Sequence, residues 1–303
     1  MGPEIKESIE PVKVVDVNNR QIKCYDDLGG NIDLTTVQSF GEEWNAFHGF
    51  ENAEIKKIGD TYFDIITPAM MGMDKTAADF GCGTGRWSKY IHDKFGAVAA
   101  IDPSDAVFAA SQLLQGVDNV HLYKASIDNL PFADNYFDFG FSLGVLHHIP
   151  DTQAAMNSCV KKIKPGGHFL VYLYYSLDNR GFLYKTLFGA SDLVRRVISK
   201  MPGWLKRFCC NMMAVFFYMP FVLFSRFLRL LGVSKKIRSK IPLHAYENTS
   251  FYIIRNDALD RFGTPLEQRF SRKQVQQMME TAGLSQIIFS EQSPYWHAVG
   301  RKS

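Results

Sequence analysis

Cysteine is scarce in this 303-residue sequence, and its five cysteines lack the spacing of a disulfide framework or a zinc ribbon. Their odd number predicts free thiols in a reducing compartment such as the cytosol. The first residues include Glu4-Ile5-Lys6-Glu7, where a secretory signal would be apolar, so we expect no such signal. The sequence also lacks a basic recognition helix and an aromatic stacking pattern, which argues against a nucleic-acid partner.

Acidic residues are nearly missing from one long stretch. Residues 180–240 contain thirteen lysines and arginines but one acid, Asp192, which gives this stretch a net charge of +12. The rest of the chain has 21 basic and 30 acidic residues, or −9, so the total is a modest +3. Such asymmetry predicts that this stretch meets an anionic partner, either a surface or a phosphate on the substrate.

The most informative pattern is a glycine-rich turn. An apolar run at 77–80 predicts a buried strand, GCGTG follows at 81–85, and a helical pattern begins at Trp87. Glycines allow sharp turns and close approach of a ligand, and the first amides of the next helix face that ligand. This order predicts the first unit of a nucleotide-binding α/β fold. Arg86 stands where the dinucleotide fingerprint has its third glycine, which disfavours a nicotinamide oxidoreductase.

Strand and helix patterns alternate regularly after this turn, which predicts a parallel sheet with right-handed crossovers. A hairpin around Asn18-Asn19 is predicted near the start of the chain, and a helix at 271–282 begins with Ser271 and stops at Gly283. The predicted strands are 12–17, 21–25, 77–80, 98–101, 120–124, 136–142, 168–174, 284–290 and 295–300.

Five motifs, taken in order, resemble those of class I S-adenosylmethionine-dependent methyltransferases. They are the G-x-G-x-G turn at 81–85, the strand-end acid Asp102, SIDNLPF at 126–132, LGVLHHIPD at 143–151 and KPGG at 164–167. The resemblance covers roughly residues 37–175 and 255–303. It implies an α/β, Rossmann-like, seven-stranded and mostly parallel sheet with helices on both faces and an antiparallel last strand beside the fifth.

A further segment, FGEEWNAF at 40–47, resembles the F-G-x-x-W-x-x-F helix that lies over the cofactor in a group of bacterial methyltransferases. Its aromatic residues at helical spacing could equally pack a helix onto the core. The resulting domain prediction is an N-terminal extension with the hairpin at 1–35, then a methyltransferase domain at 36–303. A helical, basic and hydrophobic insertion at about 176–250 interrupts that domain.

The resemblance implies S-adenosylmethionine as cofactor and no metal. It places Asp79 near the cofactor's amino group, Asp102 on the ribose diol and Ile127 on the adenine face, with Ser126 where the family has an aspartate that holds the adenine amino group. Alternatively, Asp102 is merely solvated beside a helix N-cap at Ser104 or Asp105. The residues expected to bind cofactor are Trp44, Asp79, Gly81, Cys82, Gly83, Gly85, Arg86, Asp102, Pro103, Ser126, Ile127 and Leu143.

His147 and His148 follow the fourth strand of the predicted sheet, near where the family's methyl group lies. A neutral imidazole can take the proton of a hydroxyl acceptor at physiological pH, so both are candidate general bases. Both could instead be structural, bonded to the backbone or capping the next helix. Tyr174 and Tyr175 are secondary candidates for substrate contact, and Cys82 is interpreted as a small packing residue.

The insertion contains 18 uncharged residues, 208–225, between Lys206-Arg207 and Arg226. This run just reaches the length that spans a membrane, and Pro220 should kink or end a helix within it. Three interpretations remain open: a helical cap whose apolar faces bury each other and line a substrate pocket, a membrane-surface helix pair that puts Trp204 into lipid, and a transmembrane span.

The sequence therefore predicts a methyltransferase that acts on a small lipophilic or lipid-linked acceptor, at oxygen or carbon. The alternatives are a methyltransferase of a sugar or a soluble natural-product intermediate, and a non-catalytic protein that binds S-adenosylmethionine. The expected location is the cytoplasm, at the inner face of the membrane if the insertion docks there.

Overall fold

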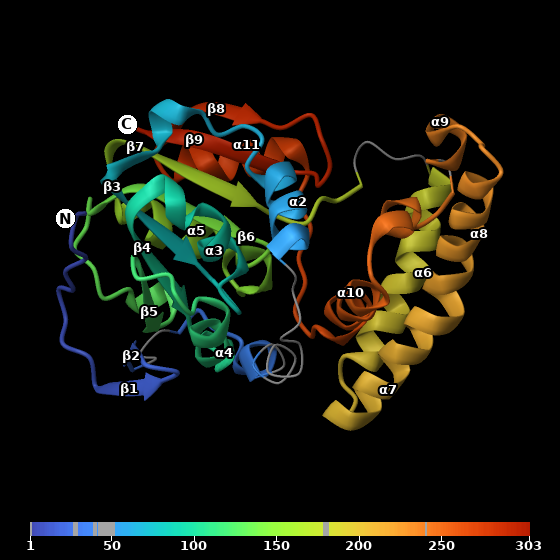
Figure 1. The fold of residues 1–303 in the computed structure, drawn as a ribbon, viewed down its shortest axis with the longest axis horizontal. Helices are drawn as coiled ribbons and strands as arrows, with labels where there is room; N and C mark the ends of the chain where they lie inside the picture. Colours follow the sequence, from blue (N-terminus) through green and yellow to red (C-terminus); the bar gives the residue numbers. More distant parts are fainter. Residues whose placement is uncertain (1, 27–29, 39–40, 42–51, 178–181, 240) are drawn as a thin grey trace. The chain divides into compact units, whose positions relative to one another are not determined.

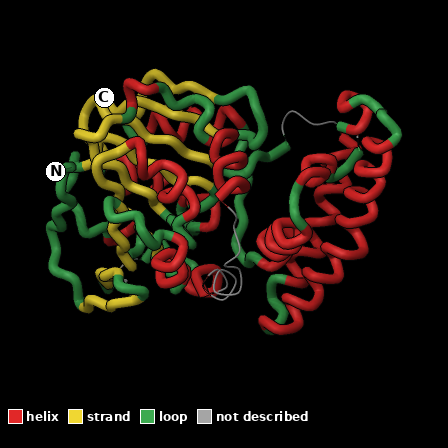
Figure 2. Tube along the Cα trace, in the orientation of Figure 1, coloured by secondary structure: helices red, strands yellow, loops and turns green. Residues whose placement is uncertain are grey.

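The computed structural model describes the chain except residues 1, 27–29, 39–40, 42–51, 178–181 and 240. The chain forms two compact units (Figure 1). The sheet unit comprises Met1–Asn179 and Leu266–Ser303, and the helical unit comprises Arg180–Pro265. Figure 2 shows that the described strands all belong to the first unit.

The sheet unit is built on nine strands in the order β1-β2-β5-β4-β3-β6-β7-β9-β8. The strands from β5 to β7 in that order are parallel, and β9 runs antiparallel beside β7, as predicted for the last strand. The bounds are β1 Lys13–Val17, β2 Arg20–Cys24, β3 Gly72–Phe80, β4 Phe95–Asp102, β5 Val120–Lys124, β6 Phe137–Leu143, β7 Ile163–Tyr172, β8 Leu284–Phe289 and β9 His297–Lys302.

Helices cover both faces of this sheet. Successive residues of a strand point to opposite faces, so Ala78 and Phe80 join one buried cluster and Ala77 joins the other. α5 and α11 supply the first cluster, and α2, α3 and α4 supply the second. Their bounds are α2 Asn52–Tyr62, α3 Arg86–Ile91, α4 Ala106–Leu113, α5 Thr152–Lys161 and α11 Arg272–Thr281. Short 3₁₀ turns lie at Pro68–Met70, His92–Lys94, Ile127–Asn129 and Leu146–His148.

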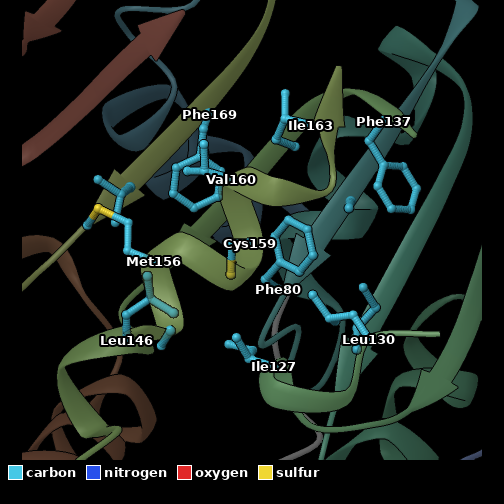
Figure 3. Packing of buried hydrophobic residues seen from close by; sticks show 14 of the residues in the cluster. Phe80, Ile127, Leu130, Phe137, Leu146, Met156, Cys159, Val160, Ile163 and Phe169 are labelled. Atoms are coloured by element: carbon cyan, nitrogen blue, oxygen red, sulfur yellow. The ribbon is translucent and has the colours of Figure 1, made fainter. Parts of the chain in front are cut away.

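Figure 3 shows the first cluster, in which Phe80, Cys159 and Phe169 lie together between the sheet and α5. All three side chains are fully buried. Burying an apolar side chain of this kind stabilises the fold by about 1.5–3 kcal/mol, so these contacts help to hold α5 against the sheet.

The predicted hairpin forms, with Asn18 and Asn19 at positive φ (52° and 61°). It does not stay outside the sheet, however, because β2 pairs in parallel with β5 and places Ile22 opposite Leu122. The predicted count of seven strands is therefore wrong. The hairpin adds two, since fully buried Ile22 gains more by packing on the second cluster than by remaining in solvent.

The predicted turn at residues 164–167 is also corrected, because β7 already begins at Ile163. The register between β6 and β7 shifts between Phe137 and Phe139, which absorbs the left-handed backbone of Gly166 (φ 79°) as an irregularity within the strand. The predicted ends of the last helix are confirmed. Ser271 and Gln274 form a capping box, and Gly283 follows the helix with φ 90°.

The longest element of the helical unit is a continuous helical run of 28 residues, Gly203–Leu230. A π-helical turn at Ala214–Tyr218 interrupts it, and Pro220 lies in the first turn of the helix that follows, as the missing amide of a proline requires. The bounds are α6 Phe182–Ile198, α7 Gly203–Met213, α8 Met219–Leu230, α9 Lys235–Arg238 and α10 Phe251–Gly263, with a 3₁₀ turn at His244–Asn248.

One side of this long run is held by polar contacts within the helical unit. Asn211 of α7 accepts a hydrogen bond from Arg255 of α10 at 2.9 Å. The hydroxyl of Ser225 donates to the buried carboxylate of Glu247 at 2.5 Å, and Arg238 donates to both oxygens of that carboxylate. Donation by Arg238 holds the pKa of Glu247 low, at about 2, so the network stays ionised at neutral pH.

Another side of the run exposes a series of large apolar side chains. By length and composition alone this helix could cross a membrane, and 28% of its most apolar 18-residue stretch is buried within the protein. Its buried residues form a narrow stripe of mostly small side chains: Cys210, Ala214, Tyr218, Val222 and Ser225. Several large apolar side chains of α7 and α8 are therefore not buried by other described helices of this unit, and the interpretation as a cap that lines a substrate pocket stays a prediction.

Candidate active site

The glycine-rich turn joins β3 to α3 and is tied to the neighbouring strand. The amides of Gly81 and Cys82 both donate to the carbonyl of Ile101, at 2.8 and 2.9 Å. Gly81 has φ 88°, and a Cβ there would lie 2.4 Å from Cγ1 of Val145. Glycine is therefore required twice over at this position, by conformation and by space. The contact also brings the turn against the segment that follows β6.

Asp102 ends β4 and braces the same turn. Its Oδ2 accepts from the amide of Gly83 at 2.8 Å, and its Oδ1 accepts from the amide and the hydroxyl of Ser104 at 2.9 and 2.6 Å. Asp102 is thus buried and fully engaged, not solvated. Burial raises its pKa, and the three donated hydrogen bonds oppose that rise. Each oxygen can accept more than one bond, so the carboxylate could still take a diol.

Asp79, at the end of β3, is completely buried. Its Oδ2 accepts from the hydroxyl of Ser88 at 2.7 Å, while its Oδ1 has no hydrogen-bond partner among the described residues. Desolvation raises the pKa of this carboxyl group to about 7, against the lowering effect of Ser88. A buried carboxylate with one free oxygen suits the amino group of an amino acid.

Two further buried hydroxyl oxygens, Thr84 Oγ1 and Ser126 Oγ, also lack hydrogen-bond partners within the described part of the chain. They follow β3 and β5, and the carboxyl ends of parallel strands meet at one edge of a sheet. Together with Asp79 Oδ1 they leave three unsatisfied buried oxygens on one edge, which a buried polar ligand would satisfy. Ile127 and Leu143 are nearly buried and supply apolar contacts at that edge. These residues fit a nucleoside that carries an amino acid.

The other expected cofactor residues lie around the same turn. Gly85 has φ 78° and precedes α3 as its N-cap, and the guanidinium of Arg86 lies over the ring of Trp87, 4.6 Å from its centroid. The thiol of Cys82 is buried, and burial raises its pKa well above the ordinary value, so it stays a neutral packing group. Gly83 has φ 53° and Pro103 is half-buried between β4 and α4.

The aromatic segment at 40–47 lies outside the described residues apart from Gly41, so the expected contact of Trp44 stays a prediction. Gly41 itself is buried, and a Cβ on it would lie 3.5 Å from the amide nitrogen of Asp105. The chain therefore passes the start of α4, next to the edge where Asp102 lies. His48, another residue of this region, is likewise outside the described part.

His147 lies in the 3₁₀ turn after β6 and is completely buried. Its ring stacks on that of Tyr174 with centroids 3.8 Å apart, and neither of its ring nitrogens has a hydrogen-bond partner among the described residues. Desolvation, aided by His148 and Arg269, holds its pKa well below the usual 6.5. The imidazole is therefore neutral at physiological pH and can accept a proton.

His148 has a different environment. Its Nδ1 lies 2.7 Å from the carbonyl oxygen of Leu266, and because a carbonyl can only accept, Nδ1 carries the proton. This bond fixes the ring in one tautomer and ties the turn to the chain that enters α11. The geometry therefore gives His148 a structural contact and separates it from His147.

The sequence reading missed two charged residues beside this cluster. Arg269 pairs with Glu267 at 2.6 Å, and its guanidinium lies over the ring of Tyr174, 5.2 Å from the centroid. The Glu267 side chain is 2% exposed, and its Oε2 has no partner within the described residues. No periodic pattern marks the segment with Glu267 and Arg269. Only the three-dimensional structure, which brings this segment next to Tyr174, reveals the two charged residues. Tyr175 instead lies against Tyr295 and Trp296.

Comparisons with known proteins agree with this geometry. Residues 78–171 match a family model described as a methyltransferase domain. The chain is 27% identical over 183 residues to the ubiquinone biosynthesis O-methyltransferase of Nitrosomonas europaea. The alignment covers 56% of this chain and 74% of that protein. The chain is 35% identical over 104 residues to phosphoethanolamine N-methyltransferase 2 of Caenorhabditis elegans, covering 33% of this chain and 24% of that protein.

Among solved structures, human N-acetylserotonin methyltransferase in complex with S-adenosylmethionine aligns with a TM-score of 0.50 at 13% identity, covering 87% of this chain and 56% of that chain. At that identity the likeness concerns the fold, which is the Rossmann-like methyltransferase fold with a mixed, mostly parallel sheet. The chain is an enzyme, an S-adenosylmethionine-dependent methyltransferase, and S-adenosylmethionine is its cofactor.

Proposed function

We propose that this methyltransferase acts on a hydroxyl group of a small lipophilic or lipid-linked acceptor in the cytoplasm. The observation that carries the proposal is His147, a buried and neutral imidazole with two unpartnered nitrogens among the described residues. A hydroxyl must lose a proton as it is methylated, whereas a sulfur or an amine acceptor has less need of a base. All five cysteines are free thiols, which supports a reducing compartment.

The relatives support the same acceptor chemistry. Several of them are named ubiquinone biosynthesis O-methyltransferase, at 26–27% identity over alignments that cover 71–75% of those proteins. Their names describe O-methylation in the biosynthesis of ubiquinone. This chain shares the methyltransferase domain with them, and we infer that it shares the kind of acceptor.

The residues of the turn would position both reactants. Asp79 would hold the amino group of the cofactor and Asp102 its ribose, and the bound cofactor would supply a methyl group on a sulfonium. Because that methyl group is already strongly electrophilic, the main task of the protein is to fix the acceptor oxygen in line with it. The proton of the acceptor hydroxyl would pass to a ring nitrogen of His147.

Tyr174 and Arg269 would position this base. The ring of Tyr174 stacks on the imidazole, and the guanidinium of Arg269 lies over the ring of Tyr174. The positive charge of Arg269 also lowers the pKa of His147, so the imidazole remains unprotonated well below pH 7. The lowered pKa keeps the imidazole of His147 neutral, and it also makes this imidazole a weaker base.

In the experiment, the intact enzyme is incubated with labelled S-adenosylmethionine and with either the organic or the aqueous phase of a cell extract. We expect labelled product in the organic phase, and none with Asp102→Asn, which loses an acceptor of the glycine-rich turn. Label confined to the aqueous phase would contradict the lipophilic acceptor and favour a sugar or another soluble intermediate.

The base is tested with His147→Asn against the matched variant His148→Asn. We expect His147→Asn to lower kcat by about 10²–10⁴-fold with little change in cofactor affinity, because it removes proton transfer and leaves the turn intact. His148→Asn should chiefly lower thermal stability. Equal losses of kcat in both variants would show that neither ring is the base.

A further inference from the structure

The exposed apolar surface of α7 and α8 is the strongest feature that methyl transfer does not use. It is defined by Trp204, Phe208, Phe216, Phe217, Phe221, Phe224, Phe227 and Leu230. The exposed fractions reach 74% for Trp204, 66% for Phe216 and 81% for Leu230. Single exposed apolar residues are ordinary, but a continuous apolar surface of this kind marks a binding site.

Cations border this surface at both ends. The exposed residue Arg207 lies in the first turns of α7, and the exposed pair Lys235-Lys236 begins α9. Arg226 and Arg229, near the end of α8, instead bond to the Glu247 segment on the covered side of the run. Residues 180–240 have a net charge of +12, and their one acid, Asp192, is already paired with Arg195 and Arg196. An apolar surface with exposed cations at its two ends complements a bilayer with anionic headgroups.

The contacts on the opposite side of the run indicate how it would lie. Asn211 bonds to Arg255 of α10, and Ser225 bonds to the ionised network of Glu247 and Arg238. α10 also carries Asp257, Asp260 and Arg261. A run that spanned the bilayer would carry these charged partners into hydrocarbon, which is costly. A run that lies in the interface leaves them in water.

We propose that the helical unit docks on an anionic phospholipid bilayer through the exposed apolar surface of α7 and α8, lying in the interfacial plane without crossing it. Phe216 and Phe217 enter the acyl chains, and the exposed residues Arg207, Lys235 and Lys236 meet the phosphates. The proposal extends the proposed function, since a lipid-linked acceptor would be met at the bilayer. It stands on the helical unit alone.

The test is flotation of the intact protein with vesicles, read as bound fraction and not as activity. We expect binding to phosphatidylcholine vesicles that contain about 30% phosphatidylglycerol, and binding at least roughly tenfold weaker to pure phosphatidylcholine. The variant Phe216→Ser with Phe217→Ser should weaken binding by roughly tenfold or more, and so should Lys235→Glu with Lys236→Glu.

The matched control is Ile9→Ser with Val12→Ser, which removes two exposed apolar side chains from the sheet unit and should leave vesicle binding unchanged. Each variant is first checked for an unchanged circular dichroism spectrum and unchanged affinity for S-adenosylhomocysteine. Trp204 offers a second readout, because its fluorescence should be quenched by brominated lipids in the intact protein and not in Trp204→Phe.

Three results would overturn the proposal. The first is no binding of the intact protein to anionic vesicles. The second is that the variant Phe216→Ser with Phe217→Ser binds these vesicles as well as the unmutated protein does. The third is bound protein that alkaline carbonate fails to release, because that would make the helix a spanning one. Methyl transfer to a detergent-dispersed acceptor would survive any of these results, so a failure here is distinct from a failure of the proposed function.

Discussion

Asp79 combines complete burial with a carboxyl pKa of about 7, so its charge changes within the physiological range. Desolvation favours the protonated form in the ligand-free protein, whereas a cationic ligand favours the carboxylate. Below its pKa, binding must therefore expel a proton from this group. We therefore expect Asp79 to make cofactor binding sensitive to pH through its Oδ1, which has no partner among the described residues.

We predict that affinity for S-adenosylmethionine falls roughly tenfold between about pH 8 and about pH 6, since a group of this pKa changes from largely ionised to largely protonated over that range. Isothermal titration calorimetry at both pH values, in buffers of different ionisation enthalpy, measures the affinity and the proton release. Asp79→Asn should bind weakly and without this pH dependence. A pH-independent affinity in the unmutated protein would contradict the assignment.

The same shift affects stability with a definite sign. Because the folded-state pKa of Asp79 lies above the ordinary value of 3.8, its burial destabilises the ligand-free fold progressively as pH rises through about 7. Asp79→Asn should therefore raise the melting temperature of the ligand-free protein at about pH 8 while it weakens cofactor binding. Higher stability together with weaker binding is the result expected when a residue destabilises the fold but contributes to function.

Gly81→Ala should be far more damaging than the matched substitution Gly116→Ala. Both glycines have positive φ, 88° and 75°, but an added Cβ at Gly116 would have nothing within 4 Å, whereas at Gly81 it would meet Val145 at 2.4 Å. We expect a loss of about 1 kcal/mol for Gly116→Ala and about 3 kcal/mol or more for Gly81→Ala. Urea denaturation followed by circular dichroism measures both, and equal losses would refute the steric argument.

The β1–β2 hairpin is the element for which the structure differs most from the sequence prediction. Arg20 of β2 donates to the carbonyl oxygens of Leu114 at 2.6 Å, Val117 at 2.7 Å and Val120. These bonds satisfy carbonyl groups that lie between the end of α4 and the start of β5. The hairpin is thus part of the support of β5, the strand that leads to Ser126 and Ile127.

Arg20→Ala should destabilise the fold by about 2–3 kcal/mol, because three partly buried carbonyl groups lose a charged donor. Lys13→Ala, in the exposed strand β1, is the control and should change stability by less than about 0.5 kcal/mol. Chemical denaturation measures both. If the two variants unfold at the same urea concentration, the hairpin is only an appendage.

At the scale of the whole molecule, the five free cysteines report on the packing of both units. Cys82, Cys159 and Cys210 are buried, and Cys24 and Cys209 are partly exposed. Burial also raises the pKa of the Cys82 and Cys159 thiols well above the usual range, which suppresses their reactive thiolate form.

We therefore predict that Ellman's reagent modifies two thiols in the native protein and five in guanidinium chloride. Cys24→Ser and Cys209→Ser should each remove one of the two fast-reacting groups. Modification of Cys82 at the rate of the two exposed thiols would contradict the packing of the turn.

The sequence by itself determined the strand–turn–helix unit at 77–91 and the strand ends that form the candidate site. Both follow from local spacing, because glycine conformations and strand periodicity are properties of neighbouring residues. Pro220 likewise marked where the long helix is interrupted. The antiparallel last strand was implied only by the resemblance to class I methyltransferases.

Only the tertiary structure decided which distant groups meet. It paired β2 with β5, brought Arg269 and Glu267 next to Tyr174, and separated the neighbouring histidines into one with a bonded nitrogen and one without. It also decided which side of α7 and α8 is covered by α10 and which remains exposed. These outcomes depend on contacts between residues far apart in the chain, whose energies no local pattern records.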